Sequence, residues 1–317
     1  MISEVTADAA APAGTPRFPV ILPGMSNVHS HAFQRAMSGL TERSGGKADD
    51  NFWSWREVMY EFLGRLTPDD IEHDAASLYK ELLAHGYTAV GEFHYLHNDI
   101  TGKHYKNPAE TSERIIAAAK ATGIHLTLLP VMYETANFGG KPAHDGQKRF
   151  THKVDDFLKL MEILVKDHGK DDAVTLGVAP HSLRAVTPDS LRSITSHLTE
   201  LGLAHYPIHI HAAEQVKEVE DCVNWSGKRP VEWLLEHYDI NTQWCFIHAT
   251  HMTDAETKKL AASGAVAGLC PTTEANLGDG IFHAETYMRA NGAFGIGSDS
   301  NVCVSPWEEL KTMEYAK

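Results

Sequence analysis

The chain has 317 residues, of which 43% are hydrophobic and 22% charged, as in ordinary folded enzymes. Its 28 Lys and Arg stand against 42 Asp and Glu, which gives a formal net charge of −14. This balance argues against binding to nucleic acid or to anionic membranes, because both require clustered positive charge. A small anionic substrate remains compatible with it if a few arginines gather in one cleft.

The first nineteen residues are rich in Ala, Pro and Thr and lack the basic start and apolar run of a signal peptide. No apolar stretch approaches the length of a membrane span. The four cysteines form no Cys-x-x-Cys pair, which argues against a disulfide framework or a thiolate zinc site and favours a reducing compartment. We therefore expect a cytoplasmic protein with a flexible N-terminal segment over residues 1–19.

From residue 19 onward, short apolar or β-branched runs alternate with helical patterns. The predicted strands are residues 19–25, 88–93, 125–131, 174–179, 206–210, 244–247, 265–269 and 293–296. Helix start signals stand between them, such as Thr67 before Pro68 and Thr253 three residues before Glu256. Repeated strand–helix alternation favours an α/β fold of the (β/α)8 TIM-barrel kind over residues 20–317, rather than an open sheet.

Two segments depart from the regular alternation. A polar, Gly-rich insertion spans residues 134–153 after the third run, and a lid over the site and a passive surface loop explain it equally well. After the eighth run only about twenty residues remain, fewer than we expect for a full closing helix. We therefore expect a barrel that is incomplete after its eighth strand.

Catalytic groups in such barrels lie at the C-terminal ends of the strands. After the first run, His29 and His31 alternate along an extended segment, so both can reach one metal ion. After the fifth, His211 offers a third imidazole, and Glu214 is placed to move protons beside a metal-bound water. We interpret His209 as structural, because Glu214 pairs with His211 by position.

His248 directly follows the sixth run, and Asp299 lies three residues after the eighth. His248 can polarise the attacking water, and Asp299 can complete the metal shell. Any single histidine is more often a structural residue than a ligand, because most buried polar groups are simply hydrogen-bonded. Candidates at the ends of four strands of one barrel make coincidence a poor explanation.

This set resembles the metal-site pattern of the amidohydrolase superfamily, and His211-x-x-Glu214 resembles that of its deaminase branch. Binuclear members carry a bridging lysine after strand four, whereas this chain reads Val178-Ala179-Pro180-His181. The resemblance therefore implies one metal ion per chain, zinc by preference, with Fe²⁺ also compatible. Longer stretches resemble the formimidoylglutamate deiminase family: residues 22–37, 52–56, 91–97, 179–184, 209–215, 225–233, 270–280 and 297–300.

The resemblance implies roles for individual residues. The implied metal ligands are His29, His31, His211 and Asp299. Glu214, His248 and Asp299 are the implied catalytic residues. The implied substrate contacts are Gln34, Arg56, Tyr95, His181 and Arg184. The two arginines suit a dicarboxylate, because guanidinium groups pair well with carboxylates.

The activity implied is hydrolytic deimination of N-formimino-L-glutamate to N-formyl-L-glutamate and ammonia, a step of histidine degradation. The family resemblance also suggests a homodimer and an accessory β-sandwich built from both chain ends, most of which this chain lacks. Two alternatives stay open. One is a zinc deaminase of a purine, pterin or triazine ring, and the other is an inactive truncated product.

Overall fold

The computed structural model describes residues 6–41, 52–203 and 205–316, with side chains from residue 55 onward in the second range. The description therefore leaves out residues 1–5 of the predicted N-terminal segment and residue 317 of the predicted barrel. It also leaves out the side chains of motif residues 52–54. The barrel strands are β1 (Met25–Ser30), β2 (Tyr87–His94), β3 (His125–Met132), β6 (Val174–Leu176) continued by β7 (Ala179–Pro180), β8 (Ile208–Ala212), β9 (Trp244–His248), β10 (Val266–Leu269) and β11 (Ala293–Ile296).

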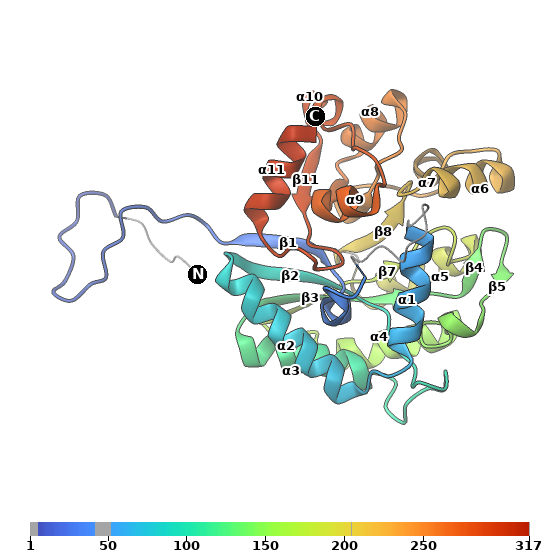
Figure 1. Cartoon of the computed structure of the whole chain (residues 1–317), viewed down its shortest axis with the longest axis horizontal. Coiled ribbons are helices and arrows are strands. Elements are labelled where there is room, and N and C mark those ends of the chain that lie inside the picture. The colour runs from blue at the N-terminus through green and yellow to red at the C-terminus, as the bar shows by residue number, and fades with distance from the viewer. Residues whose placement is uncertain (1–5, 42–51, 204, 317) are drawn as a thin grey trace.

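All the barrel strands are parallel, in two sheets that meet at both edges (Figure 1). One sheet has the order β1-β2-β3-β6 with β7 on β3, and the other has the order β11-β10-β9-β8. Bridges between Val178 and Ile208 and between Ser30 and Asp299 join the two sheets. The predicted TIM-like barrel is therefore confirmed.

Helices cover the outside of this barrel (Figure 1). They are α1 (Phe52–Leu63), α2 (Pro68–Ala84), α3 (Glu110–Thr122), α4 (Val154–His168), α5 (Pro188–Glu200), α6 (Val216–Ser226), α7 (Pro230–His237), α8 (Asp254–Ser263), α9 (Pro271–Leu277), α10 (Ala284–Arg289) and α11 (Pro306–Ala316). Capping boxes start α2 at Thr67 and α8 at Thr253, as the sequence predicts. None of these helices, within the described ranges, is long and apolar enough to span a membrane.

The predicted start of the first strand was wrong. The first strand begins at Met25 and not at residue 19, because pairing with β2 starts where Met25 lies opposite Tyr87. The apolar residues before it, such as Val20 at 71% exposure, lie on an arm that leaves the barrel (Figure 1). At the other end, the 11-residue helix α11 follows β11 and packs on α9 and β11, and whether the barrel is incomplete after its eighth strand stays a prediction.

Smaller differences concern the middle of the chain. The fourth predicted strand is interrupted at Gly177, where the backbone packs so closely on its neighbours that a Cβ would lie 2.7 Å from the Pro207 carbonyl oxygen. The insertion at residues 134–153 is not featureless: it forms the hairpin β4 (Thr135–Asn137) and β5 (Lys141–Pro142) and the short 3-10 helix η2 (Asp145–Gln147). Its role as a lid stays a prediction.

The first and last strands meet at the closing seam of the barrel, formed by residues 27–31 and 297–301. The backbone N–H of His31 donates to the Asp299 carbonyl at 3.0 Å, and that of Asp299 donates to the His29 carbonyl at 2.9 Å. Gly297 permits this approach, since a Cβ there would lie 2.8 Å from the Cβ of His29. The seam thus fixes the backbone of three proposed ligands relative to one another.

Buried amide and hydroxyl side chains complete the closing seam. Asn27 Oδ1 accepts from the N–H groups of Ser298 and His29 at 3.1 and 3.2 Å, and Asn27 Nδ2 donates to Ser298 Oγ at 2.6 Å. Ser298 Oγ in turn donates to Asn301 Oδ1 at 2.6 Å. Because all four residues are at most 1% exposed, each of these bonds replaces water that cannot enter.

Replacing Asn27 with Ala should lower the free energy of unfolding by about 3 kcal/mol, because two buried N–H donors and one hydroxyl lose their partner. Urea unfolding followed by circular dichroism measures this change. Asn224→Ala, at an exposed position on α6, is the matched control and should change it by less than about 0.5 kcal/mol. Equal stability of the two variants would show that the seam does not depend on Asn27.

Three buried histidines lie together behind the C-terminal end of β2. The Nε2 atoms of His97 and His152 both donate to the Val131 carbonyl, each at 3.1 Å, and His94 Nε2 lies 3.0 Å from Thr111 Oγ1. Burial lowers the pKa of His94 to about 3 and that of His152 to about 4, and it lowers the pKa of His97 well below its usual range. All three are therefore neutral in the folded protein at neutral pH.

The unfolded chain protonates these histidines below pH 6.5, whereas the folded protein does not, so the stability that they contribute falls as the pH drops below 6.5. His94→Gln should remove about one proton from this difference and flatten the slope by about 1.4 kcal/mol per pH unit between pH 6 and 5. Urea unfolding at several pH values measures the slope. An unchanged slope in His94→Gln, with exposed His73→Gln as control, would contradict a neutral buried His94.

Candidate metal and substrate site

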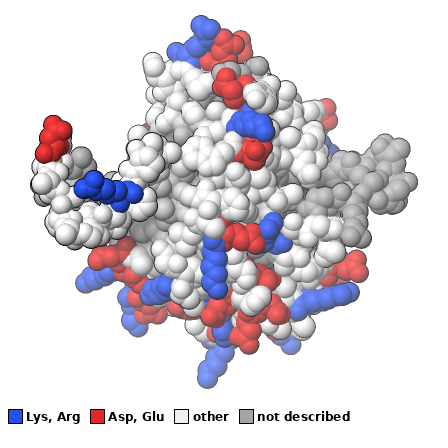
Figure 2. Space-filling model, turned by 60° about the vertical axis from the view of Figure 1, so that its left-hand side comes forward, with Lys and Arg blue, Asp and Glu red and all other residues white. Residues whose placement is uncertain are grey.

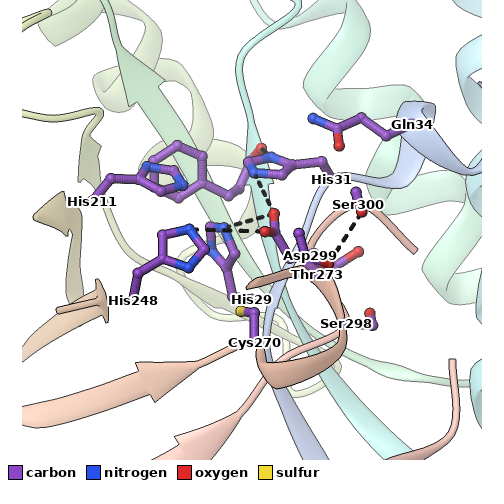
Figure 3. A network of polar contacts seen from close by, with 12 residues as sticks. His29, His31, Gln34, His211, His248, Cys270, Thr273, Ser298, Asp299 and Ser300 are labelled. Carbon is purple, nitrogen blue, oxygen red and sulfur yellow. Dashed lines mark hydrogen bonds and ion pairs between the residues drawn. The ribbon is translucent and has the colours of Figure 1, made fainter. Parts of the chain in front are cut away.

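Four strand ends bring the predicted ligands together in the centre of the barrel (Figure 3). His29 and His31 come from β1 and the residue after it, His211 from β8, His248 from β9, and Asp299 follows β11. All five side chains are at most 6% exposed. One donor atom from each of His29, His31 and His211 lies within 4.8 Å of the others, which is compatible with a shared metal ion.

Asp299 joins these three imidazoles to His248. Its Oδ1 lies 3.2 Å from His31 Nε2 and 3.5 Å from His29 Nε2, and its Oδ2 lies 3.8 Å from His248 Nε2 (Figure 3). Although burial opposes its ionisation, the adjacent imidazoles of His29 and His31 hold the pKa of Asp299 well below its ordinary value. The carboxylate therefore carries its negative charge inside the barrel.

Backbone carbonyls fix the tautomers of two of the imidazoles. His31 Nδ1 lies 3.0 Å from the Phe93 carbonyl oxygen, and His211 Nδ1 lies 3.1 Å from that of His181. A carbonyl can only accept, so each Nδ1 carries the hydrogen and each Nε2 keeps its lone pair. This arrangement leaves Nε2 free to ligate a metal, with the carbonyl orienting the ring.

The residues fit a metal ion by a second criterion. Both ring nitrogens of His29 are buried without a hydrogen-bond partner among the described residues, which is uncommon for buried polar atoms. Burial lowers the pKa of His29 to about 4 and the pKa of His211 well below its usual range, so both imidazoles are neutral. Neutral imidazoles with one ionised carboxylate are the donor set that zinc prefers when no thiolate is present.

Cys270 lies near this group but is a poor ligand. Its Sγ falls within 4.8 Å of donor atoms of His248 and Asp299. However, burial raises the pKa of the Cys270 thiol well above its ordinary value, and only the thiolate binds a metal strongly.

His248 differs from the other imidazoles because carboxylates surround it. Its Nδ1 lies 3.1 Å from Glu274 Oε1, and its Nε2 lies 3.8 Å from Glu214 Oε1. Burial disfavours the imidazolium, but Glu214, Glu274 and Asp299 outweigh it and raise the pKa of His248 to about 10. In the metal-free protein His248 is therefore a cation held among carboxylates.

Glu274 is a site residue that the sequence-based assignment missed. It lies on α9 and accepts from the backbone N–H of Cys270 at 3.0 Å as well as contacting His248. Its only signal in the sequence is membership of the 270–280 motif.

Left-handed backbone conformations at His248 (φ 67°) and Asp299 (φ 45°) show that these two positions are also conformationally constrained.

A cavity opens over the ligand group. The predicted residues on its wall are His31, Gln34, Arg56, Tyr95, His181, Arg184, His211, Glu214, His248 and Asp299. His29 lies beneath the wall, and His209 is buried outside it, as a structural histidine would be. Wall residues absent from the sequence-based list are Trp55, Met59, Tyr133, Phe150, Thr273, Leu277 and Ser300.

Two arginines give this wall positive charge at separate points. Arg184, 5% exposed, has an Nη2 atom 3.8 Å from Glu214 Oε2, and its buried Nε has no hydrogen-bond partner among the described residues. Arg56 lies on α1, and its Nη2 donates to Tyr133 Oη at 2.8 Å. Elsewhere, on the face in Figure 2, Lys and Arg are interspersed with Asp and Glu.

The family model described as the amidohydrolase family matches residues 20–316. The chain belongs to the amidohydrolase family. It is 50% identical over 317 residues to the formimidoylglutamate deiminase of Pseudomonas aeruginosa, covering all of this chain and 69% of that protein. It is 27% identical to a 5-methylthioadenosine/S-adenosylhomocysteine deaminase of Natronomonas pharaonis, covering 88% of this chain and 57% of that protein.

Solved structures of other amidohydrolases agree with the fold. The crystal structure of an amidohydrolase from Brucella melitensis superposes with a TM-score of 0.89 at 55% identity, covering 93% of this chain and 64% of that one. An adenosine deaminase from Xanthomonas campestris with bound zinc gives a TM-score of 0.75 at 21% identity, covering 93% and 60%. This amidohydrolase chain thus spans roughly two thirds of the length of these relatives.

Metal binding by this group can be measured without activity. His211→Asn should weaken zinc binding at least ~100-fold, because loss of a direct ligand exceeds the 10–100-fold effect of outer residues. His209→Asn, on the same strand, is the matched control and should bind zinc as the parent does. Competition with a zinc-binding dye and the zinc-induced rise in Tm report both results. Equal affinities in the two variants would remove His211 from the ligand set.

Proposed function

We propose that this chain hydrolyses N-formimino-L-glutamate to N-formyl-L-glutamate and ammonia, with one zinc ion held by His29, His31, His211 and Asp299. The main support is the combination of this ligand group with two arginines on one cavity wall in a chain of net charge −14. The 50% identity to a formimidoylglutamate deiminase over the whole chain points to the same substrate. When bound, zinc would supply Lewis-acid activation of water near neutral pH.

Glu214 is the group we assign to proton transfer. It is 5% exposed, its backbone N–H donates to Glu218 Oε2 at 3.1 Å, and its carboxylate faces His248 and Arg184. Its carboxylate would take a proton from the attacking water as the new C–O bond forms. It would deliver that proton to the terminal formimino nitrogen and then carry a second one to it from the newly added hydroxyl, so that the C–N bond breaks with loss of ammonia as the C=O bond forms.

His248 and Asp299 orient the attacking oxygen in this proposal. Because Glu274 holds His248 Nδ1, the Nε2 hydrogen of the imidazolium points between Glu214 and Asp299. A donor at that position stabilises negative charge that develops on the attacked centre. Gln34 and Tyr95, joined by a 2.9 Å hydrogen bond, and the neutral His181 would shape the cavity around the substrate.

The two arginines separate the two carboxylates of the substrate. Arg184 lies beside Glu214 and so beside the reacting carbon, which suits the α-carboxylate, the nearer of the two along the substrate chain. Arg56 lies on α1 and lines the same cavity, and we assign it to the distal carboxylate. A guanidinium can bind a carboxylate through two parallel hydrogen bonds.

The setting of the reaction is also part of the proposal. We place it in histidine degradation in the cytoplasm, with the enzyme as a homodimer. Support for a reducing compartment comes from the four cysteines, which are all free thiols, three of them buried. The homodimer is suggested by the resemblance to the family, and size-exclusion chromatography with light scattering tests it.

Zinc-loaded protein should release ammonia from N-formimino-L-glutamate, and Glu214→Gln should lower kcat by about 10²–10⁴-fold through loss of the proton carrier. A glutamate dehydrogenase assay measures ammonia. Glu220→Gln, exposed on the neighbouring helix α6, is the control and should keep the parent rate.

Zinc content measured on every sample separates loss of metal from loss of proton transfer. Turnover of Glu214→Gln at the parent rate with zinc bound would contradict the role of Glu214. No turnover by folded, zinc-loaded parent would contradict the substrate, and a panel of purine, pterin and triazine rings would then test the ring deaminases.

A further inference from the structure

Tyr133 is a cavity-wall residue to which neither the sequence motifs nor the proposed mechanism gives a role. It follows β3 directly, is 2% exposed, and packs its ring against His181 at 4.7 Å and Phe150 at 5.6 Å between ring centroids. Its hydroxyl oxygen accepts from Arg56 Nη2 at 2.8 Å and from Gln147 Nε2 at 2.6 Å. The phenol thus connects α1 with the insertion after β3.

The directions of both hydrogen bonds are fixed by chemistry. A guanidinium can only donate, so Arg56 is the donor in its bond to Tyr133. The amide of Gln147 has its orientation set by a second contact, because Gln147 Oε1 accepts from the backbone N–H of His144 at 3.1 Å. Its Nε2 is therefore the atom that donates to the phenol.

These two bonds use both lone pairs of the phenolic oxygen. The hydroxyl hydrogen is the one hydrogen-bonding capacity that Tyr133 has left, and the described part of the chain, which omits the side chains of residues 52–54, shows no acceptor for it. A buried donor on a cavity wall without an acceptor costs free energy until a ligand supplies one. Tyr133 is thus preset as a donor toward the cavity.

The place of Tyr133 in the cavity identifies the group that it would meet. The ring of the proposed ligand His211 lies 4.9 Å from that of His181, and the ring of His181 lies 4.7 Å from that of Tyr133. Tyr133 is therefore separated from the ligand group by the His181 ring, and Arg56 lies beside its hydroxyl. Arg184, in contrast, lies next to Glu214.

We infer that the Tyr133 hydroxyl donates a hydrogen bond to the distal carboxylate of the substrate, beside Arg56, and so selects for a dicarboxylate. This inference rests on the proposed function for the identity of the substrate. Neighbouring Tyr133 and Tyr60 raise the pKa of Arg56 despite its burial, which keeps a cation next to the phenol. The Gln147 amide donates to the phenolic oxygen and so restricts the direction in which the hydroxyl hydrogen can point. Because Gln147 belongs to the insertion, the insertion takes part in this recognition.

Tyr133→Phe keeps the ring contacts with His181 and Phe150 and removes only the hydroxyl. Loss of one hydrogen bond to a carboxylate should raise KM for N-formimino-L-glutamate about 10- to 100-fold. The rate constant kcat should change little, because the contact lies away from the reacting carbon. Tyr87→Phe is the matched control: it removes another buried phenol hydroxyl, at the start of β2, and should leave KM unchanged.

Two shortened substrates locate the contact. N-formimino-L-norvaline has a methyl group in place of the distal carboxylate, and N-formimino-4-aminobutanoate lacks the α-carboxylate. The loss in kcat/KM caused by Tyr133→Phe should disappear with the norvaline compound and persist with the aminobutanoate compound. An equal loss with all three substrates, or a loss that follows the α-carboxylate, would overturn the inference.

Binding measurements keep this test separate from the activity. Titration calorimetry with N-formyl-L-glutamate compares the parent with Tyr133→Phe and Tyr87→Phe without any turnover. If the parent fails to release ammonia, the proposed substrate reaction is wrong, yet weaker binding by Tyr133→Phe alone would still support a dicarboxylate contact. Equal binding by all three proteins, or none by the parent, would overturn it.

Discussion

Closure of the barrel between its first and last strands is the constraint on which the site depends. His29 and His31 come from one end of the chain and Asp299 from the other, and only the closing seam puts them in contact. The seam relies on Asn27, Ser298 and Asn301 because β1 and β11 share a single bridge and not a full ladder. Buried amides tolerate little displacement, since each lost bond leaves an unsatisfied group behind. The seam beneath the site, and not the ligand side chains themselves, therefore determines how precisely the ligands are positioned.

The site holds neutral and positively charged imidazoles close to one another. The imidazoles of His29 and His211 are neutral because burial disfavours their charged forms, whereas His248 is cationic because carboxylates surround it. Chemically identical side chains thus serve as ligand or as hydrogen-bond donor according to their neighbours. Glu214, Glu274 and Asp299 together cause this difference for His248, and of these Glu274 lies outside the set of residues that would touch substrate or metal.

The sequence predicted that the proposed ligands lie near one another because parallel strands converge at their C-terminal ends, so residues after different strands become neighbours. The first strand was misplaced because the run around Val20 is apolar, and apolarity alone does not tell where pairing with β2 begins. Arg56 lies on α1, where no strand-end argument applies, and only the family resemblance singled it out. Glu274 and Tyr133 act through contacts with residues far away in the sequence, which periodicity and spacing do not encode.

Apart from β1, which brings His29 and His31 to the site, the two sheets of the barrel divide the work of the site. Strands β8 to β11 and the segments after them carry His211, Glu214, His248 and Asp299, while β2 to β7 and their following segments carry Tyr95, Tyr133, His181 and Arg184. The insertion belongs to the second group, since Gln147 reaches only Tyr133 and its own helical turn. Substitutions or exchanges in that insertion can therefore alter which molecules fit while proton transfer stays intact. In evolutionary terms, the fold lets substrate range and chemistry drift on separate halves of one barrel.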